Sequence, residues 1–102
     1  MRRRYVLAPQ AAGDLVQIWR YLKTEAGRET ADRVERVIRG KFAYLAEFPD
    51  AGHWRRDLTN ADVRFFSVYS YLVVYRPETR PLQVVSILHG SRDVTEVLSE
   101  RL

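Results

Sequence analysis

The sequence predicts an α+β fold in which a helical hairpin packs on an antiparallel sheet. Two observations indicate this class. Between residues 9 and 48, apolar side chains recur every three or four positions, which is the period of amphipathic helices. Between residues 63 and 88 the chain is instead rich in Val, Ile, Phe and Tyr, in short runs separated by turn residues, as in sequential strands. The expected element order is β-α-α-β-β-β-α.

The first half of the chain contains one short strand and the two helices. Residues 4–7 are predicted to form a short strand that ends before Pro9, and proline is well tolerated in a first helical turn. The helical period then covers residues 9–26 and stops at Gly27. It restarts over residues 30–48 and ends at Pro49. Two helices joined by so short a turn are expected to pack as an antiparallel hairpin.

The second half contains a loop, three strands and a final helix. Residues 49–62 follow neither period and hold turn-forming residues, so we expect a connecting loop. The strands are predicted at residues 63–68, 71–76 and 82–88, with short connections that indicate an antiparallel meander. Asp93 can cap a last helix, with Glu96 at the third helical position and Val94, Val97 and Leu98 facing inward.

The length and composition exclude several classes of protein. A chain of 102 residues fits one domain, so we expect a single unit over residues 1–102. It has no Cys and two His, which excludes a disulfide framework, a thiol nucleophile and a zinc–thiolate site. We therefore expect no metal and no cofactor. Its apolar runs are too short for a secretory signal or a membrane span, so a cytoplasmic protein is expected.

The charge of the chain is basic but not concentrated on one face. The net charge is +4 and the pI about 9.8, which suits a nucleic-acid partner. However, most of the excess comes from Arg2, Arg3 and Arg4. In the second predicted helix, acids and arginines alternate at i, i+4 spacing, which is typical of an exposed face with ion pairs rather than of a phosphate-binding track.

The segment from His89 to Asp93 is the first candidate for chemistry. It brings an imidazole, a glycine and Arg92 to a helix N-terminus, where a phosphate could be bound or a proton moved. The simpler interpretation, which the residues favour, is a structural one: a sheet-end histidine with a satisfied hydrogen bond, a turn glycine and an arginine paired with an acid. A catalytic site without metal would need further groups to converge there, and the candidates on neighbouring strands are Arg64, Tyr75 and Arg76.

Aromatic residues give weaker indications. In the loop, Trp54 stands beside Arg55 and Arg56, as base stacking with phosphate contact would require, although Trp54 could equally close the edge of the core. Trp19 has the helical spacing of a core residue.

The order of several short segments resembles the RelE/ParE superfamily of type II toxin–antitoxin toxins, closest to its ParE-like branch. The resemblance extends over nearly the whole chain. The segments are Leu7-Ala8-Pro9-Gln10-Ala11, residues 14–22, residues 45–52, Val63-Arg64, residues 71–76 and residues 88–93. The resemblance implies the α+β fold described above. One departure is the turn between the second and third strands, where Tyr69-Ser70 stands in place of the glycine that ParE-like sequences often carry.

The superfamily contains two activities, which the resemblance alone does not separate. RelE-like members are ribosome-dependent mRNA endonucleases without a metal, whereas ParE-like members are taken to poison DNA gyrase by binding. The RNase branch typically has an Arg where Leu72 stands and a Tyr where Leu98 stands, and only its later Arg has a counterpart, Arg92. A leucine neither moves a proton nor stabilises charge, so the RNase set is incomplete. Other RNase branches use His, so His89 keeps that alternative open.

The resemblance therefore implies a non-enzymatic toxin that inhibits gyrase and growth, stabilises a plasmid or genome, and is neutralised by a cognate antitoxin. The alternatives are a ribosome-dependent RNase and a non-toxic relative that binds only its antitoxin. The predicted target-binding residues, chosen because sheet-end and terminal groups are left available, are Arg64, Arg76, His89, Arg92, Glu96 and Arg101. In the RNase alternative, the catalytic residues would be His89, Arg92, Arg64 and Arg76. The residues predicted to contact the antitoxin are Leu15, Trp19, Leu22, Val37 and Tyr44. An antitoxin is expected to supply an amphipathic helix and an extended acidic segment.

Overall fold

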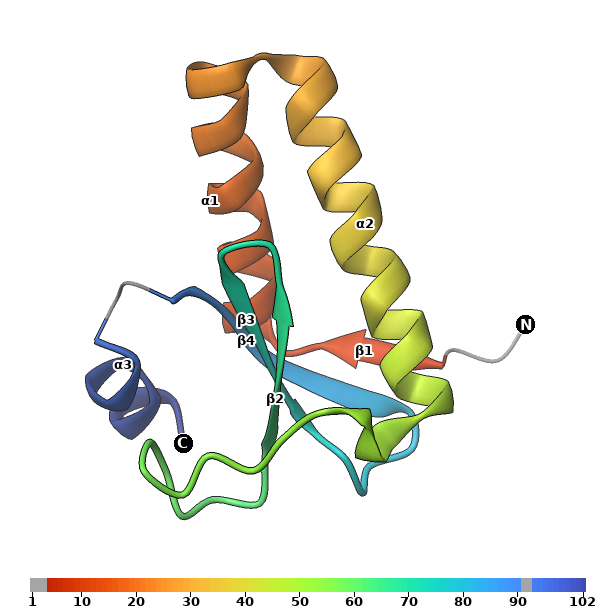
Figure 1. Ribbon diagram of the computed structural model, residues 1–102, viewed down its shortest axis with the longest axis vertical. Coiled ribbons are helices and arrows are strands. Elements are labelled where there is room, and N and C mark those ends of the chain that lie inside the picture. The colour runs from red at the N-terminus through yellow and green to blue at the C-terminus, as the bar shows by residue number, and fades with distance from the viewer. Residues whose placement is uncertain (1–3, 91–92) are drawn as a thin grey trace.

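The expected fold class and element order are confirmed. A computed structural model describes residues 4–90 and 93–102 (Figure 1). The elements in chain order are β1 (Tyr5–Leu7), α1 (Pro9–Ala26), α2 (Arg28–Glu47), the 3₁₀ turn η1 (Pro49–Ala51), β2 (Arg64–Val68), β3 (Tyr71–Arg76), β4 (Leu82–His89) and α3 (Val94–Arg101). The predicted loop over residues 49–62 thus contains one helical turn. It also contains a single bridge between His53 and Phe65.

The four strands form one sheet in the order β1-β4-β3-β2. The meander is antiparallel, as predicted, because β2 pairs with β3 and β3 with β4 in that sense. The prediction of a wholly antiparallel sheet is wrong for β1, which runs parallel to β4, so the sheet is mixed. The reason is topological: β1 finds its neighbour in the last strand, after the whole hairpin and meander have intervened. Leu82 N–H donates to the Arg4 carbonyl at 3.0 Å and Ala8 N–H to the Val84 carbonyl at 2.9 Å.

The helical hairpin covers one face of the sheet. Pro9 occupies the first turn of α1, and Gly27 joins the two helices with φ of 93°, a conformation that favours glycine. The turn end of the hairpin extends past the sheet (Figure 1). The larger core cluster lies between the hairpin and the sheet and is formed by Ala11, Leu15, Val34, Ile38, Phe42, Leu45, Val68, Tyr71, Val73, Tyr75, Leu82, Val84 and Ile87.

The C-terminal helix α3 covers the opposite face. Asp93 caps it as predicted, since its carboxylate accepts the Glu96 N–H at 3.1 Å. The second core cluster lies between α3 and the sheet and contains Val63, Phe65, Val74, Val85, Leu88, Val94 and Leu98. The sheet is therefore buried on both faces, which explains why β3 and β4 read as nearly continuous apolar runs.

The turn between β2 and β3 uses a strained residue in place of glycine. Tyr69 has φ of 54°, in the left-handed region that non-glycine residues seldom adopt. The tight connection between Val68 and Tyr71, which pair directly, requires that conformation. Tyr69 thus supplies, without a glycine, the positive φ that this two-residue turn uses.

One buried ion pair connects the layers. Asp14 faces the core from α1 and is 6% exposed. Its carboxylate accepts two hydrogen bonds from Arg101 of α3, at 2.6 and 2.9 Å, and a third from the backbone N–H of Ile87 on β4, at 2.9 Å. Arg101 also donates to the Ser86 hydroxyl at 3.1 Å. Asp14 therefore holds α1, β4 and α3 together where the edge of β4 extends beyond β1.

Replacing Asp14 by Ala should destabilise the protein by about 2–4 kcal/mol, because Arg101 and the Ile87 N–H would lose their acceptor in a buried place. Urea unfolding followed by circular dichroism measures this loss. Glu35→Ala is the control, since the Glu35–Arg39 pair is exposed and spans 3.4 Å. It should change stability by no more than about 0.5 kcal/mol. Equal effects of the two substitutions would contradict the assigned role of Asp14.

Candidate functional site

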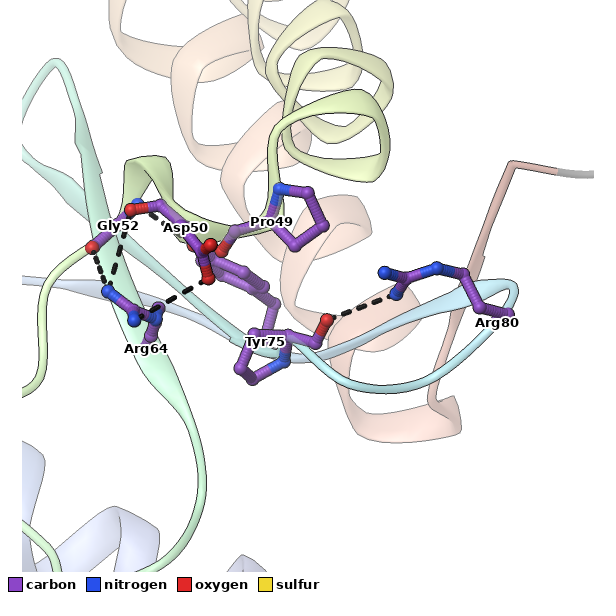
Figure 2. A network of polar contacts seen from close by, with 7 residues as sticks. Pro49, Asp50, Gly52, Arg64, Tyr75 and Arg80 are labelled. Atoms are coloured by element: carbon purple, nitrogen blue, oxygen red, sulfur yellow. Dashed lines mark hydrogen bonds and ion pairs between the residues drawn. The ribbon is translucent and has the colours of Figure 1, made fainter.

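The loop after α2 is clamped to the sheet by the buried tyrosine of β3 (Figure 2). The Tyr75 hydroxyl donates to the Pro49 carbonyl at 2.6 Å and accepts the Gly52 N–H at 2.9 Å. Arg64 donates to the Gly52 carbonyl at 2.9 Å and lies 3.6 Å from the Asp50 carboxylate. Gly52 has no room for a side chain, because a Cβ there would lie 2.9 Å from the Phe65 carbonyl oxygen. Tyr75 and Arg64 therefore have structural partners in this clamp.

Trp54 is stacked with cations rather than open for a base. The guanidinium carbons of Arg64 and Arg56 lie 4.4 and 4.7 Å from its ring centroid. Arg56 is 3.9 Å from Asp62, and Arg55 pairs with Asp57 at 2.8 Å. Because each arginine of the loop has a nearby aspartate, the segment is not the basic, open platform that nucleic-acid stacking requires. Trp54 is 39% exposed, so it does not close the core either.

The predicted cations of β2 and β3 point to different faces of the sheet. The Arg64 side chain lies on the face of the sheet that the helical hairpin covers, because Arg64 pairs in register with Tyr75, whose side chain is on that face. Arg76 comes next to Tyr75 and therefore points to the face of α3, since successive side chains alternate. There Arg76 donates to the Gln83 side chain at 3.1 Å.

His89 lies at the other end of the sheet. It pairs with Tyr71 across β3 and β4, and their rings meet edge to face with centroids 5.5 Å apart. Tyr75 follows Tyr71 by four positions along β3, so His89 is about 13 Å along the strand direction from the position of Arg64. His89 borders an open recess of about 330 Å³ together with Tyr21, Tyr71 and Asp14.

The predicted site residues therefore do not converge among the parts of the chain that the structure describes. Arg64 and His89 lie at opposite ends of one face, and Arg76 lies on the other face. Arg92, together with Ser91, falls outside the described residues. Glu96 is exposed on α3. The assumption that terminal groups are left available is wrong for Arg101, which is held by Asp14 because a buried carboxylate needs a cation beside it. Its hydrogen bond to Asp14 raises the pKa of Arg101.

Burial also revises the predicted antitoxin surface. Leu15 is 2% exposed and lies inside the core, so its side chain offers almost no surface to the predicted antitoxin contact. Leu22 and Val37 are half-buried at the margin of the core. Trp19 is half-buried rather than a core residue, and its indole N–H donates to Asp32 across the hairpin at 2.8 Å. Tyr44 is 43% exposed.

Sequence reasoning missed Asp14 and the clamp at Gly52. Asp14 had a signal, because it lies three residues after Ala11 and four before Ile18, within the apolar stripe of its helix. An acid in that position indicates a buried partner. Gly52 had no comparable signal, since its close contact with Tyr75 joins residues 23 positions apart in the chain.

Comparison with known proteins agrees with this architecture. Residues 5–94 match the family described as the ParE toxin of the type II toxin–antitoxin system parDE. The chain therefore belongs to the ParE toxin family, a class of toxins of type II toxin–antitoxin systems. A solved structure titled "Chromosomal ParDE TA system from P. aeruginosa" shares the fold, with a TM-score of 0.70, 19% identity, and coverage of 83% of this chain and 92% of that one. No curated protein sequence matches the chain.

Two further features bear on the kind of site. In the described part of the chain, no group of His, Asp and Glu side chains is placed to hold a metal ion. No helix there is long and apolar enough to span a bilayer.

Gly52→Ala should destabilise the protein by about 2–4 kcal/mol, because the added methyl group overlaps the Tyr75 hydroxyl and a backbone carbonyl. Gly40→Ala is the matched control. Gly40 lies within α2 with nothing near its missing Cβ, so this change should stabilise by up to about 1 kcal/mol. Thermal unfolding of both variants tests the clamp. A Gly52 variant as stable as the wild type would show that Tyr75 does not hold the loop.

Two buried tyrosines should resist ionisation when the pH is raised. Burial raises the pKa of Tyr75, against the opposing effects of the Gly52 N–H and the Arg64 charge. Burial, with a smaller effect of Tyr21, raises the pKa of Tyr71. The unfolded chain ionises its tyrosines near pH 10, before these two ionise in the folded state, so stability should be full below about pH 10 and fall above it.

Phenolate absorbance during alkaline titration measures this delay. Tyr71→Phe should reduce the late component, because it removes one of the two buried phenols. A single transition for all tyrosines of the folded protein would contradict the expected burial effect.

Proposed function

We propose that this protein is a toxin that inhibits DNA gyrase by binding it, and that a cognate antitoxin neutralises it. Membership of the ParE toxin family supports the toxin role. The resemblance of the sequence to the ParE-like branch supports gyrase as the target.

The observation that favours binding over RNA cleavage concerns Leu72 and Leu98. These leucines stand where the RNase branch carries an arginine and a tyrosine. Leu98 is 1% exposed in the cluster beneath α3, and Leu72 packs against the same cluster. An apolar, water-excluding contact offers neither a proton donor nor a cation to a scissile phosphate. The wide separation of Arg64, Arg76 and His89 supports the same conclusion.

The antitoxin is proposed to contact the exposed side of the helical hairpin around Trp19, Leu22 and Val37. These side chains are half-buried, and the hairpin extends past the sheet (Figure 1). An amphipathic helix of a partner can complete the burial of such residues. An acidic segment would also suit the +4 charge of the chain.

Purified gyrase and plasmid, titrated with this protein, should show trapped linear DNA and loss of supercoiling activity. A parallel reaction with ribosomes and mRNA should leave the transcript intact. Cleaved mRNA with normal supercoiling would instead establish the RNase alternative. Absence of both effects, with antitoxin binding retained, would identify a non-toxic relative.

The double variant His89→Ala/Arg92→Ala should weaken gyrase inhibition by about tenfold or more, as expected when contact residues are truncated. Arg80→Ala is the matched control. The Arg80 side chain donates only to the Pro77 and Thr79 carbonyls of its own turn in the described contacts, so its loss should leave inhibition unchanged. Full inhibition by a folded double variant would remove His89 and Arg92 from the target-binding surface.

A further inference from the structure

Tyr69, in the turn between β2 and β3, combines a strained backbone with an exposed ring. Its φ of 54° lies in the left-handed region, where a side chain is disfavoured and glycine fits without strain. Its own side chain is nevertheless large and 61% exposed. No hydrogen bond, ion pair or ring contact joins that side chain to another described residue. Because no such contact within the chain offsets the strain, Tyr69 has the character of a residue kept for function rather than for folding.

The turn holds Tyr69 in a fixed place beside the recess by His89. Val68 and Tyr71 pair directly on either side of the turn, and the Gly90 N–H donates to the Ser70 carbonyl at 2.8 Å. Tyr71, two residues after Tyr69, lines the recess. A ring on so short and well-bonded a turn loses little conformational freedom when a partner binds it.

The recess has apolar walls and neutral hydrogen-bonding groups. Ile18 and Ile87 supply apolar surface, while Gln17 and the two tyrosines Tyr21 and Tyr71 supply an amide and phenols. Tyr21, on α1, is itself 61% exposed. The recess is therefore built to receive an amphipathic side chain.

The charges of the recess disfavour a phosphate as its occupant. Among the described residues that line it, there is no Lys or Arg. Its one carboxylate, that of Asp14, is already paired with Arg101 at 2.6 Å. DNA is held mainly by cations that contact its phosphates, so this end of the sheet suits a protein surface better than a nucleic acid.

We propose that Tyr69 is the anchor by which this toxin contacts the protein surface of gyrase, and that the recess between Tyr21 and Tyr71 receives a neutral side chain of that surface. This inference rests on the proposed function and names the contact that performs it. Exposed tyrosines on rigid backbone are typical centres of binding energy in protein interfaces. The proposal adds Tyr69 and Tyr21 to the target-binding residues and places them on the same end of the sheet as His89.

The strain at Tyr69 makes stability and inhibition separable. Tyr69→Gly and Tyr69→Asn remove the ring and supply residues that tolerate a positive φ, so neither should lower the melting temperature. Both should raise the concentration needed for half-inhibition of supercoiling by about tenfold or more. Tyr69→Phe keeps the ring and should retain inhibition. A residue with only a structural role would not give this combination.

Supercoiling assays and binding to immobilised gyrase, each beside thermal unfolding, measure these effects. Tyr21→Ser, at the rim of the recess, should also weaken binding to gyrase. Phe48→Ser is the matched control, because Phe48 is 51% exposed at the end of α2, outside the recess. It should leave inhibition and binding unchanged. Binding to plasmid without gyrase is measured in parallel and should be the same for wild type and Tyr69→Gly.

The outcomes separate this inference from the proposed function. A wild type without effect on gyrase overturns both. A wild type that inhibits gyrase, with Tyr69→Gly and Tyr69→Asn inhibiting equally well, overturns this inference alone. Binding to plasmid that is lost in Tyr69→Gly would assign the ring to DNA and also overturn it. A Tyr69→Gly variant that melts below the wild type would show that Tyr69 is kept for folding, with the same consequence.

Discussion

The buried ion pair between Asp14 and Arg101 connects the three layers of this small protein. The Asp14 carboxylate comes from the hairpin, Arg101 comes from α3, and the third donor is the backbone of β4 between them. A lone buried carboxylate would be costly, so the contact requires all three layers to be in place together. It also covers the edge of β4 beyond β1, where an unpaired N–H would otherwise be open to another strand.

This arrangement determines which surfaces remain for function. Apolar clusters close both faces of the sheet, and several cations that could contact a substrate have partners inside the molecule. Arg101 binds Asp14 and Arg64 binds the loop at Gly52, while Arg76 binds Gln83. The surfaces that remain are the outside of the hairpin, the recess by His89 and the exposed rings of Tyr44 and Phe48 at the end of α2. Within the described residues they hold no converging set of acids and bases, which supports the proposal that the protein acts by binding.

Local patterns predicted the fold well because each depends on neighbouring residues. The helical period, the stop at Gly27, the strand composition and the Asp93 cap all agree with the structure, to within two residues at most boundaries. The parallel pairing of β1 with β4 was missed, since strand order depends on contacts between the two ends of the chain. Leu15 and Trp19 show that local spacing also fails to predict the burial of single side chains. Both have core spacing on α1, yet only Leu15 lies over the sheet.

The sequence by itself determined the fold class, the element order, the resemblance to the ParE-like toxins and the incomplete RNase set. The fold class and element order need only residue identity and spacing along the chain, and the last two conclusions add a comparison of those residues with the family pattern. The tertiary structure alone decided which charged groups have partners, that Arg64 and Arg76 face opposite sides, and that Tyr44, Phe48 and Phe66 meet. The physical reason is that the ion pairs and aromatic contacts involved join residues up to 87 positions apart. No local period carries information about such distant neighbours.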